Sequence, residues 1–483
     1  MRLLITVLAC LVPFFAQASS NAINSTLPVE AADCLIVDHD RNIVMIEEAL
    51  SGKFSIPGGS IIGKETPQEA AKRETMEETG LNVDVGKKIA QTYNSAVYAC
   101  KVLGLPRYFD DANGQRLIYS WYAPHFGKEV KRVLLMPDTQ AMRDKYRFPE
   151  HKWMFDKWTK LVEPSRFRLT SNARSELTPF YGYQLSWLES LRAKTFNGGL
   201  SSTLGNTVVL VGSVVTPVFF LLMLPLVRTL LGHRALLIFG AGMLTLTSIT
   251  LILSTLIHVP RPLYVEPMFT YHDTLGFTLP STMLALTTYV FACAWIFWDE
   301  EKYPKKRLWV TSLGVVLMAA STAKAMLLGE HYPTDMIISV LLGLGAAVCL
   351  WKVKDRRFAD RSRILTSTRF WGAAFVVVAV IGSVIHKPQL IYLSALTLGT
   401  FCALIWLKIS PVFVSPGRRK YKIAFFAVAT AGIFFLMMLD RHLTANTAIN
   451  EIIVLWNCIA LWTISVWLLV ILPRIFYRAV KQS

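Results

Sequence analysis

The spacing of apolar residues changes along the chain near residue 206. Before this point the apolar runs are short, about four to eight residues, and turn-forming residues separate them. After it, about nine apolar segments each approach the roughly 20 residues that a membrane-spanning helix needs. The pattern predicts an α/β domain followed by an all-α polytopic membrane bundle. Its expected spans lie near 207–227, 235–257, 280–298, 308–328, 334–351, 370–386, 389–407, 423–439 and 451–473.

Strand-forming residues and one strong helix signal occupy the first region. Thr66 is a favourable N-cap, Pro67 suits the first helical position, and Glu69 completes a T-x-x-E capping box. Gly80 is the expected end of this helix, in the left-handed conformation. The predicted strands are 34–37, 43–46, 82–85, 96–102 and 117–122.

Three glutamates fall on one face of this helix. Glu74, Glu77 and Glu78 are spaced i, i+3 and i+4. Like charges at that spacing repel one another and destabilise a helix. A bound divalent cation with oxygen ligands, Mg²⁺ or Mn²⁺, would offset this repulsion, and such a cation also carries substrate phosphates. The alternative interpretation is a solvated acidic helix face.

The run GSIIGKETPQEAAKRETMEETGL at 59–81 resembles the Nudix signature, G-x5-E-x7-R-E-U-x-E-E-x-G-U. FSIPGG at 54–59 also resembles the family's strand-to-loop entry. One position departs, because Thr75 stands where the family has a bulky aliphatic residue. The matching positions are Gly59, Glu65, Arg73, Glu74, Glu77, Glu78, Gly80 and Leu81.

The resemblance implies an α/β/α sandwich at residues 30–158 and hydrolysis of a diphosphate linked to another group. It makes Glu74 and Glu78 the metal ligands, with Glu77 in support. Arg73 would orient a carboxylate, and Glu65 would support the loop or the metal. The metal would neutralise the diphosphate and activate a water. Further ligands stay open among Glu129, Glu150 and Glu163.

The basic excess of the chain follows the apolar segments. The formal net charge is +17, and the lysines and arginines collect in alternate loops of the second half. This is a topology signal rather than a nucleic-acid-binding surface, so no nucleic acid partner is expected. The positive-inside rule places those loops in the cytoplasm and the segment before the first span outside. The loops lie near 228–234, 302–307, 352–363, 418–422 and 474–481.

Residues 1–18 have the pattern of a secretory signal peptide. Arg2 is followed by an apolar run from 3 to 15 and an A-x-A site that ends at Ala18. An uncleaved anchor is the alternative. We expect a multi-pass protein of the bacterial inner membrane with its first domain on the periplasmic side. Cys34 and Cys100 are the cysteines of that domain, and an exported domain permits a disulfide without establishing one.

Residues 159–205 are predicted to connect the two parts. The segment at 184–195 is amphipathic, with Trp187 and Leu188 against Glu189 and Arg192. It is either a helix on the membrane surface or a plain inter-domain helix.

Three loop motifs on the outer side carry a second resemblance. They contain Arg261, which can grip phosphate oxygens with two nitrogens, and His331, four residues before Asp335. The order VPRP at 259–262, LPST at 279–282 and GEHYPTD at 329–335 resembles the type 2 phosphatidic acid phosphatase family at residues 206–352. By resemblance His331 is the nucleophile and Asp335 holds its ring in one tautomer. No cofactor is expected in this module.

This sequence also departs from the phosphatase motifs. Ser254 stands at the lysine of the first motif, Met283 at the histidine of the second, and Ala325 at the arginine of the third. Lys324 is the nearest replacement for that arginine, and it is expected to face a polar cavity. His258 and His272 are further candidates to replace lost groups. Ser281 is a substrate-binding candidate, although Pro-Ser is also an ordinary helix start.

The residues from 353 to 483 show no ionisable cluster within the spans, and they are assigned to additional helices. Together these features predict a membrane phosphohydrolase that combines diphosphate hydrolysis with a lipid phosphatase-like module. The expected substrates are lipid-linked, such as undecaprenyl diphosphate, or phospholipid or lipid A phosphates. The alternatives are a Nudix enzyme on a degenerate lipid-binding platform and, less favoured, a transporter.

Overall fold

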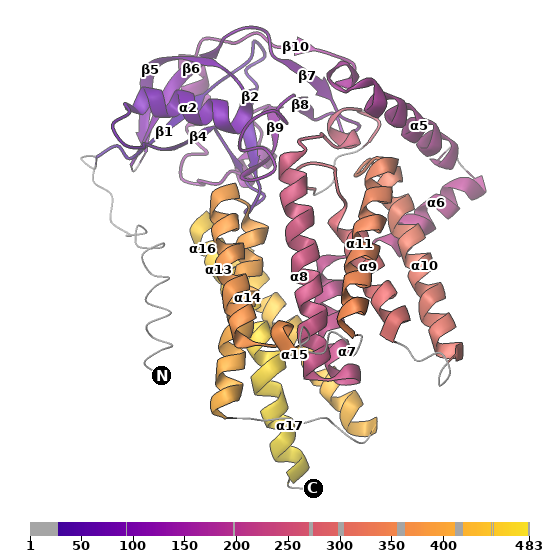
Figure 1. Ribbon diagram of the computed structural model, residues 1–483. Coiled ribbons are helices and arrows are strands. Elements are labelled where there is room, and N and C mark those ends of the chain that lie inside the picture. Colours follow the sequence, from indigo (N-terminus) through magenta and orange to yellow (C-terminus); the bar gives the residue numbers. More distant parts are fainter. Residues whose placement is uncertain are drawn as a thin grey trace.

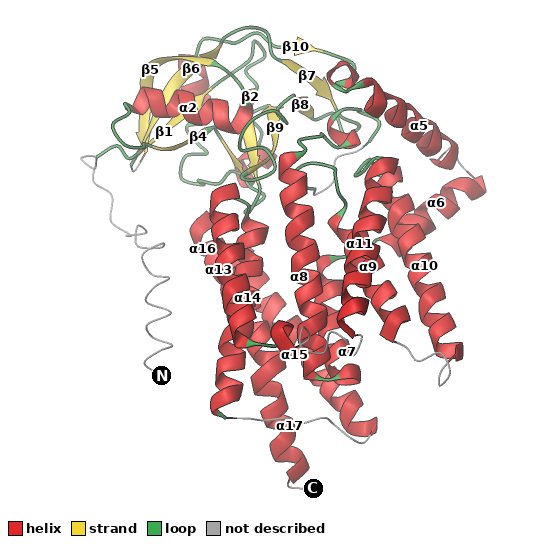
Figure 2. Ribbon diagram, in the orientation of Figure 1, coloured by secondary structure: helices red, strands yellow, loops and turns green. Residues whose placement is uncertain are grey.

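The computed structural model describes residues 28–92, 94–196, 199–269, 274–297, 304–354, 363–410, 419–445, 447 and 449–481. A β-rich part lies at one end of a bundle of long helices (Figure 1). Figure 2 shows that the strands are confined to that end. The predicted order, an α/β region followed by an all-α region, is confirmed. The predicted signal peptide and His272 lie outside the described residues.

Two sheets form the β-rich part, in the orders β4-β1-β6-β5 and β10-β7-β8-β9-β2-β3. In the first sheet β1 runs parallel to β6 and antiparallel to β4. The strands are β1 (Ala31–Leu35), β2 (Ile43–Glu48), β3 (Phe54–Ser55), β4 (Gly58–Ser60), β5 (Val83–Thr92), β6 (Ser95–Val102), β7 (Arg107–Asp110), β8 (Arg116–Ile118), β9 (Val130–Met136) and β10 (Arg168–Leu169). Each predicted strand overlaps one of these.

Strand β9 was not predicted from the sequence, although it pairs with both β2 and β8. Six of its seven residues are buried, so both of its faces are covered. A strand covered on both faces has no alternation of apolar and polar positions, and alternation was the signal used to find strands. Lys131 and Arg132, which interrupt its apolar pattern, both pair with Glu47 of β2.

Helix α2 (Pro67–Thr79) begins and ends where the sequence predicts. Thr66 accepts from the backbone N–H of Glu69, and the Glu69 carboxylate accepts from the N–H of Thr66 at 2.7 Å. Gly80 takes a φ of 73°, and its N–H donates to the carbonyl of Met76. Both ends of the helix are therefore satisfied by local hydrogen bonds. The remaining short helices of this part are α3 (Gln140–Asp144) and α4 (Phe155–Trp158).

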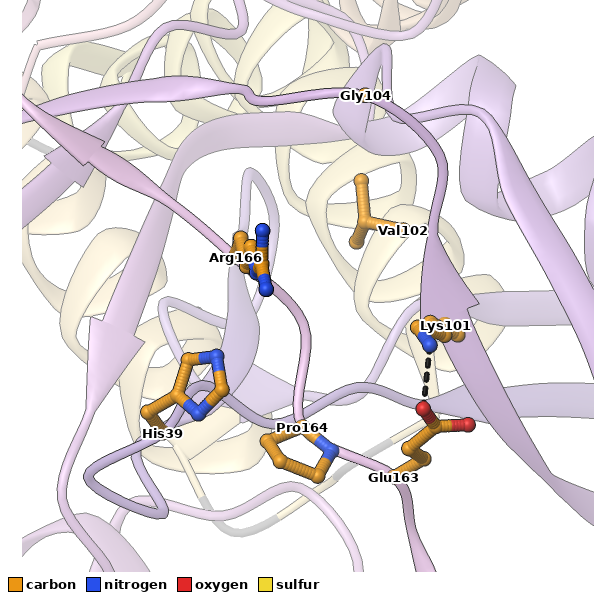
Figure 3. Close-up of a pocket in the computed structure, with 7 residues that line it drawn as sticks. All are labelled: His39, Lys101, Val102, Gly104, Glu163, Pro164 and Arg166. Atoms are coloured by element: carbon orange, nitrogen blue, oxygen red, sulfur yellow. Dashed lines mark hydrogen bonds and ion pairs between the residues drawn. The ribbon is translucent and has the colours of Figure 1, made fainter.

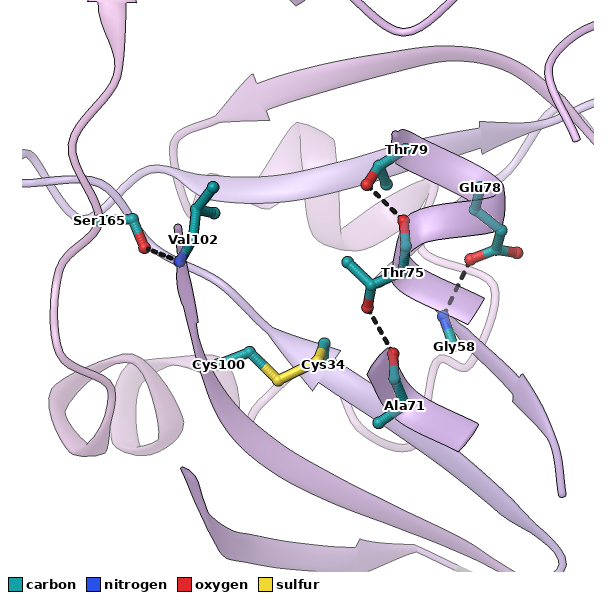
Figure 4. The surroundings of a disulfide bond; sticks show 9 residues. All are labelled: Cys34, Gly58, Ala71, Thr75, Glu78, Thr79, Cys100, Val102 and Ser165. Carbon is teal, nitrogen blue, oxygen red and sulfur yellow. Dashed lines mark hydrogen bonds between the residues drawn. A yellow bond between two sulfur atoms is a disulfide. The ribbon is translucent and has the colours of Figure 1, made fainter. Parts of the chain in front are cut away.

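A disulfide joins Cys34 of β1 to Cys100 of β6 (Figure 4). The Cα atoms are 5.5 Å apart, and both residues are fully buried. The sequence left this bond open, because two cysteines do not show that their strands are neighbours. The parallel pairing of β1 with β6 brings them together.

The connector contains α5 (Pro179–Phe196), which covers the predicted amphipathic segment. Leu185 and Leu188 are fully buried, whereas Tyr183 and Trp187 are exposed. The sheet extends beyond Trp158, the predicted end of the first domain, because β10 pairs with β7.

Seven helices among the described residues are long and apolar enough to cross a membrane, or eight if one bent pair counts as a single span. The predicted count of about nine is therefore not confirmed. Helix α9 is a shorter apolar helix. The bent pair consists of Ser202–Gly212 and Pro217–Leu231, which meet at 51°. The helices are α6 (Gly199–Gly212), α7 (Pro217–Leu231), α8 (His233–Leu256), α9 (Thr282–Phe297), α10 (Pro304–Leu327), α11 (Pro333–Lys354), α13 (Thr368–Ile385), α14 (Pro388–Ile409), α15 (Arg419–Ala445), α16 (Asn450–Val466) and α17 (Leu472–Lys481).

The β-rich part packs directly on one end of the bundle (Figure 1). The Phe126 ring lies 5.2 Å from that of Tyr264 and 5.5 Å from that of Phe277, centroid to centroid. Asn450, at the start of α16, donates to the Glu48 carboxylate at 3.2 Å. The loops at this end of the bundle, which carry the three phosphatase-like motifs, therefore face the Nudix-like part.

Candidate functional site

Side chains from two elements converge at α2. Glu74, Glu77 and His125 each offer a ligand atom, and these atoms lie within 4.8 Å of one another. His125 reaches from the loop before β9, and its backbone N–H donates to the carbonyl of Glu77 at 2.8 Å. This bond holds the loop against the helix. Two carboxylates and an imidazole at this separation suit a divalent cation.

Arg73 sets the positions of the surrounding carboxylates. Its Nη1 donates to Glu74 at 2.8 Å and to Glu77 at 2.9 Å, while Nη2 donates to Glu65 at 2.8 Å. Glu65 also accepts from the backbone N–H of Ile62 at 2.6 Å. The carboxylate of Glu65 is thus directed at Arg73 and the loop backbone, and the loop is braced against the helix.

Glu78 is buried beside this group. It accepts from the backbone N–H of Gly58 at 2.9 Å (Figure 4). Burial raises the pKa of Glu78 well above its usual range, and the charges of Glu74, Glu48 and Glu129 raise it further. Burial also raises the pKa of Glu74. A bound cation offsets the free-energy cost of ionising these carboxyl groups, since it stabilises carboxylates in a poorly solvated place. The donor set therefore fits a hard divalent metal.

Two positions of the Nudix-like motif have structural explanations. A Cβ at Gly59 would lie 2.5 Å from the carboxyl carbon of Glu74, so a side chain there would push the carboxylate away. Thr75, the departure from the motif, is fully buried, and its hydroxyl donates to the carbonyl of Ala71 at 2.7 Å (Figure 4). The threonine is accommodated because its polar atom is satisfied within the helix.

His125 was not predicted as a site residue from the sequence. Its Nδ1 lies 3.2 Å from Glu129, and this contact, more than its burial, sets the raised pKa of His125. Of the three open ligand candidates, the structure brings only Glu129 to the cluster. The i, i+4 spacing of His125 and Glu129 was the one signal available, but no helix pattern surrounds it. Glu150 lies instead 3.8 Å from His151.

Glu163 lies at a separate pocket, where it pairs with Lys101 (Figure 3). The pocket has a volume of about 410 Å³ and contains none of the acidic cluster residues. Its lining residues are His39, Lys101, Val102, Gly104, Glu163, Pro164 and Arg166.

The three membrane-side motifs meet around Arg261. Its guanidinium donates to the backbone carbonyls of Gly276 at 2.9 Å, Glu330 at 3.0 Å and Leu275 at 3.2 Å. Its Nη1 also lies 3.3 Å from Nε2 of His331. Arg261, in the loop after α8, therefore contacts the loops before α9 and before α11. Its positive charge lies next to the ring of His331.

His331 is buried, and its ring is held in one tautomer. Nδ1 lies 2.5 Å from the carbonyl oxygen of Thr278, which can only accept, so Nδ1 carries the proton. Nε2 is then left with a lone pair, which faces Arg261. Burial and the charge of Arg261 lower the pKa of His331 to about 3. A neutral ring with an unprotonated Nε2 is the form that a nucleophile requires.

The expected direct contact between Asp335 and the His331 ring is wrong. Asp335 accepts from the hydroxyl of Thr278 and from the backbone N–H of Tyr332 at 2.9 Å. The reason is its place in the first turn of α11, where a carboxylate reaches back to cap the helix start. Asp335 therefore acts on His331 through Thr278, whose carbonyl holds the ring.

The other phosphatase-like positions lie outside the Arg261–His331 contacts described above. Lys324 pairs with Glu330 at 2.7 Å, so its charge is compensated. Ser281 accepts from the backbone N–H of Leu284 at 3.5 Å at the start of α9, as an ordinary helix start does. Met283 and Ala325 pack in apolar clusters. Ser254 accepts a hydrogen bond from Lys387 at 2.9 Å.

Comparisons with known proteins match both parts. A family model for the NUDIX domain matches residues 27–133, and one for the PAP2 superfamily matches residues 235–359. A NUDIX hydrolase from Nitrosomonas europaea is similar to the chain at 16% identity and a TM-score of 0.21, over 31% of this chain and 82% of that one. A UDP-X diphosphatase is similar at 17% identity and a TM-score of 0.19, over 34% and 74%. No curated protein matches.

Both resemblances seen in the sequence are confirmed by the family models. Nudix domains generally use divalent metals, which agrees with the acidic cluster on α2. The apolar helices, together with the second match, indicate a membrane protein. The chain is a hydrolase of phosphate bonds in which a Nudix domain is followed by a PAP2 superfamily, lipid phosphatase-like domain.

Proposed function

We propose that the Nudix domain hydrolyses the diphosphate group of a lipid-linked substrate with Mg²⁺, or Mn²⁺ in its place. The observation that carries this is the group of Glu74, Glu77 and His125, whose ligand atoms lie within 4.8 Å of one another. The buried carboxyl of Glu78 follows on the same helix face, and burial raises the pKa of both Glu74 and Glu78. Those four residues would hold the cation. When bound, the cation neutralises diphosphate charge and activates a water.

The neighbouring residues keep this group in place. Arg73 orients Glu74 and Glu77 through its two hydrogen bonds, and Glu65 fixes Arg73 from the other side. The absence of a side chain at Gly59 leaves the Glu74 carboxylate free to turn toward the ligand.

The membrane module is proposed to act on a lipid phosphate at the same end of the bundle. His331 would attack phosphorus through Nε2, and Arg261 would bind the phosphate oxygens. Asp335 positions His331 through Thr278. Because Met283 replaces the second-motif histidine, the departing lipid alcohol would take its proton from water, and a second water would then release phosphate from His331.

The two sites lie on segments that contact each other. The ring of Phe126, which directly follows His125, lies 5.2 Å from that of Tyr264, in the loop that carries Arg261. This proximity supports action in series, in which a diphosphate cut in the first site leaves a lipid monophosphate for the second.

Several features support an extracytoplasmic location for the Nudix domain. The basic loops predicted to be cytoplasmic include the ends of α11 and α17, away from the Nudix domain (Figure 1). The Cys34–Cys100 disulfide is typical of an oxidising compartment. In a double-membrane bacterium this is the periplasmic face of the inner membrane. Substrates such as undecaprenyl diphosphate, or phospholipid or lipid A phosphates, are available there.

The test is diphosphate hydrolysis by the purified full-length protein in detergent, with undecaprenyl diphosphate and Mg²⁺. Glu78→Gln should abolish turnover, because it removes a carboxylate from the cation site. Glu163→Gln is the matched control, since that carboxylate is exposed and pairs with Lys101. Equal turnover in Glu78→Gln and the native protein would refute the site.

A non-catalytic lipid-binding platform is the second candidate for the membrane module. It is favoured by Met283 and Ala325, which lie in apolar clusters, and by the pairing of Lys324 with Glu330. Phosphate release from phosphatidic acid separates the two. Release that His331→Ala abolishes supports the phosphatase, whereas no release by the native protein supports the platform.

A further inference from the structure

Lys387 lies where a lysine is unfavourable for the fold. It directly precedes Pro388, the first residue of α14, so its charge meets the positive end of the helix dipole. Only 4% of the residue is exposed. Its Nζ donates to the hydroxyl of Ser254 on α8 at 2.9 Å. The bond joins the additional C-terminal helices to the phosphatase-like core.

The two positive charges here form no ion pair with a carboxylate among the described residues. Within the described part of the chain, neither Lys387 nor Arg261 pairs with a carboxylate: the first donates to a hydroxyl, and the second to backbone carbonyls and His331. Burial, with the positive charges of Arg261 and Lys128 added, lowers the pKa of Lys387 to about 8. A buried cation among like charges costs stability unless an anion joins it.

Another lysine on the same helix shows the ordinary arrangement. Lys408, in the last turn of α14, donates to the hydroxyl of Thr368 at 2.8 Å, and the contact is exposed to solvent. At that end a lysine favours the helix dipole. Both lysines bind a hydroxyl, but only Lys387 is buried, at the wrong helix end, and beside another cation. Helix stability therefore does not explain Lys387.

The hydroxyl that Lys387 binds has a particular place in the motif. Ser254 occupies the position at which the phosphatase pattern has its first-motif lysine. The ammonium of Lys387 thus reaches that position from a different helix, 133 residues later in the chain. The positive charge that α8 lacks at residue 254 is therefore supplied by Lys387.

We propose that Lys387 is a phosphate-binding residue of the membrane module and supplies the ammonium that Ser254 cannot. Together with Arg261 and His331 it forms a site for a tetrahedral phosphate dianion, carried by a lipid or free in solution. The α13–α14 loop thereby gives the additional C-terminal helices a part in ligand binding. This inference rests on the proposed phosphate-directed function of the module.

The experiment measures binding of inorganic phosphate and, separately, of dioctanoyl phosphatidic acid to full-length protein in detergent, by calorimetry. Lys387→Ser should weaken binding about 10- to 100-fold, the usual effect of losing one charge-assisted hydrogen bond. The double variant Lys387→Ser with Ser254→Lys exchanges the two side chains and should recover most of the affinity. Lys408→Ser is the matched control, and it should bind as the native protein does.

The outcomes separate this inference from the proposed function. Unchanged phosphate affinity in Lys387→Ser, or no phosphate binding by the native protein, overturns the inference even if lipid phosphate is hydrolysed. A folded double variant that binds no better than Lys387→Ser also overturns it, with folding checked by thermal unfolding. Binding that depends on Lys387 without turnover supports the site and refutes only the phosphatase activity. Tighter binding of the lipid than of inorganic phosphate identifies the lipid headgroup as the ligand.

Discussion

Removal of the Cys34–Cys100 disulfide should destabilise the Nudix domain strongly. The bond lies in the buried interior between β1 and β6, and the two cysteines are 66 residues apart in sequence. The closed loop contains α2, so Glu74, Glu77 and Glu78 lie within it, whereas His125 and Glu129 lie outside it. Replacement of both cysteines by alanine opens this loop in the unfolded chain and leaves no buried thiol.

The magnitude follows from loop entropy. For a closure of 66 residues, the chain-entropy relation gives a stabilisation of about 4 kcal/mol at 25 °C. For a domain of this size, a loss of that order lowers the midpoint of thermal unfolding by roughly 15 °C. The membrane helices are outside the loop and should keep their stability.

The assay is pulse proteolysis of full-length protein in detergent after heating, which follows cleavage of the Nudix domain. Cys349→Ala is the matched control, because Cys349 is a free, exposed cysteine of α11. Reductant should lower the midpoint of the native protein and leave that of the Cys34→Ala, Cys100→Ala variant unchanged. Equal midpoints for the native protein and this variant, or two alkylatable thiols at these positions in unreduced protein, would show the reasoning to be wrong.

Three further predictions concern single side chains. Gly59→Ala should reduce diphosphate turnover at least about tenfold, because its Cβ would collide with the Glu74 carboxyl group, and normal turnover would contradict the proposed role of that carboxylate. Phe126→Ala should cost about 3 to 5 kcal/mol at the contact between the two modules, and proteolysis of the loop carrying Tyr264 should accelerate; an unchanged cleavage rate would contradict the packing. Burial raises the pKa of Asp33 to about 6, above its unfolded value of 3.8, so its stabilising effect is complete below about pH 4 and is lost as the pH rises through 6. Asp33→Asn should therefore gain up to about 3 kcal/mol relative to the native protein at pH 8 but not at pH 4, and parallel stability curves would refute the shift.

Local chemistry made much of the Nudix site predictable. Three features act within one helix: the capping box at Thr66, the stop at Gly80, and the i, i+3, i+4 spacing of the glutamates. Within a helix, the spacing of residues in the sequence fixes their separation in space. The long apolar segments were recognisable for a similar reason, because the length of a span depends on its own residues.

The tertiary structure decided which distant residues meet. His125 joins the cluster because its loop, 46 residues beyond the end of α2 at Thr79, folds back onto the helix. Cys34 meets Cys100 because β1 and β6 run in parallel. The partner of the His331 ring proved to be a backbone carbonyl, and a carbonyl exists at every position and so leaves no mark in a sequence. Ser254 lies on α8 and Lys387 directly before α14, far apart in the chain, and only the packing of these helices brings the ammonium to the hydroxyl. Periodicity reports the environment of a segment, whereas contacts between segments depend on how the whole chain is packed.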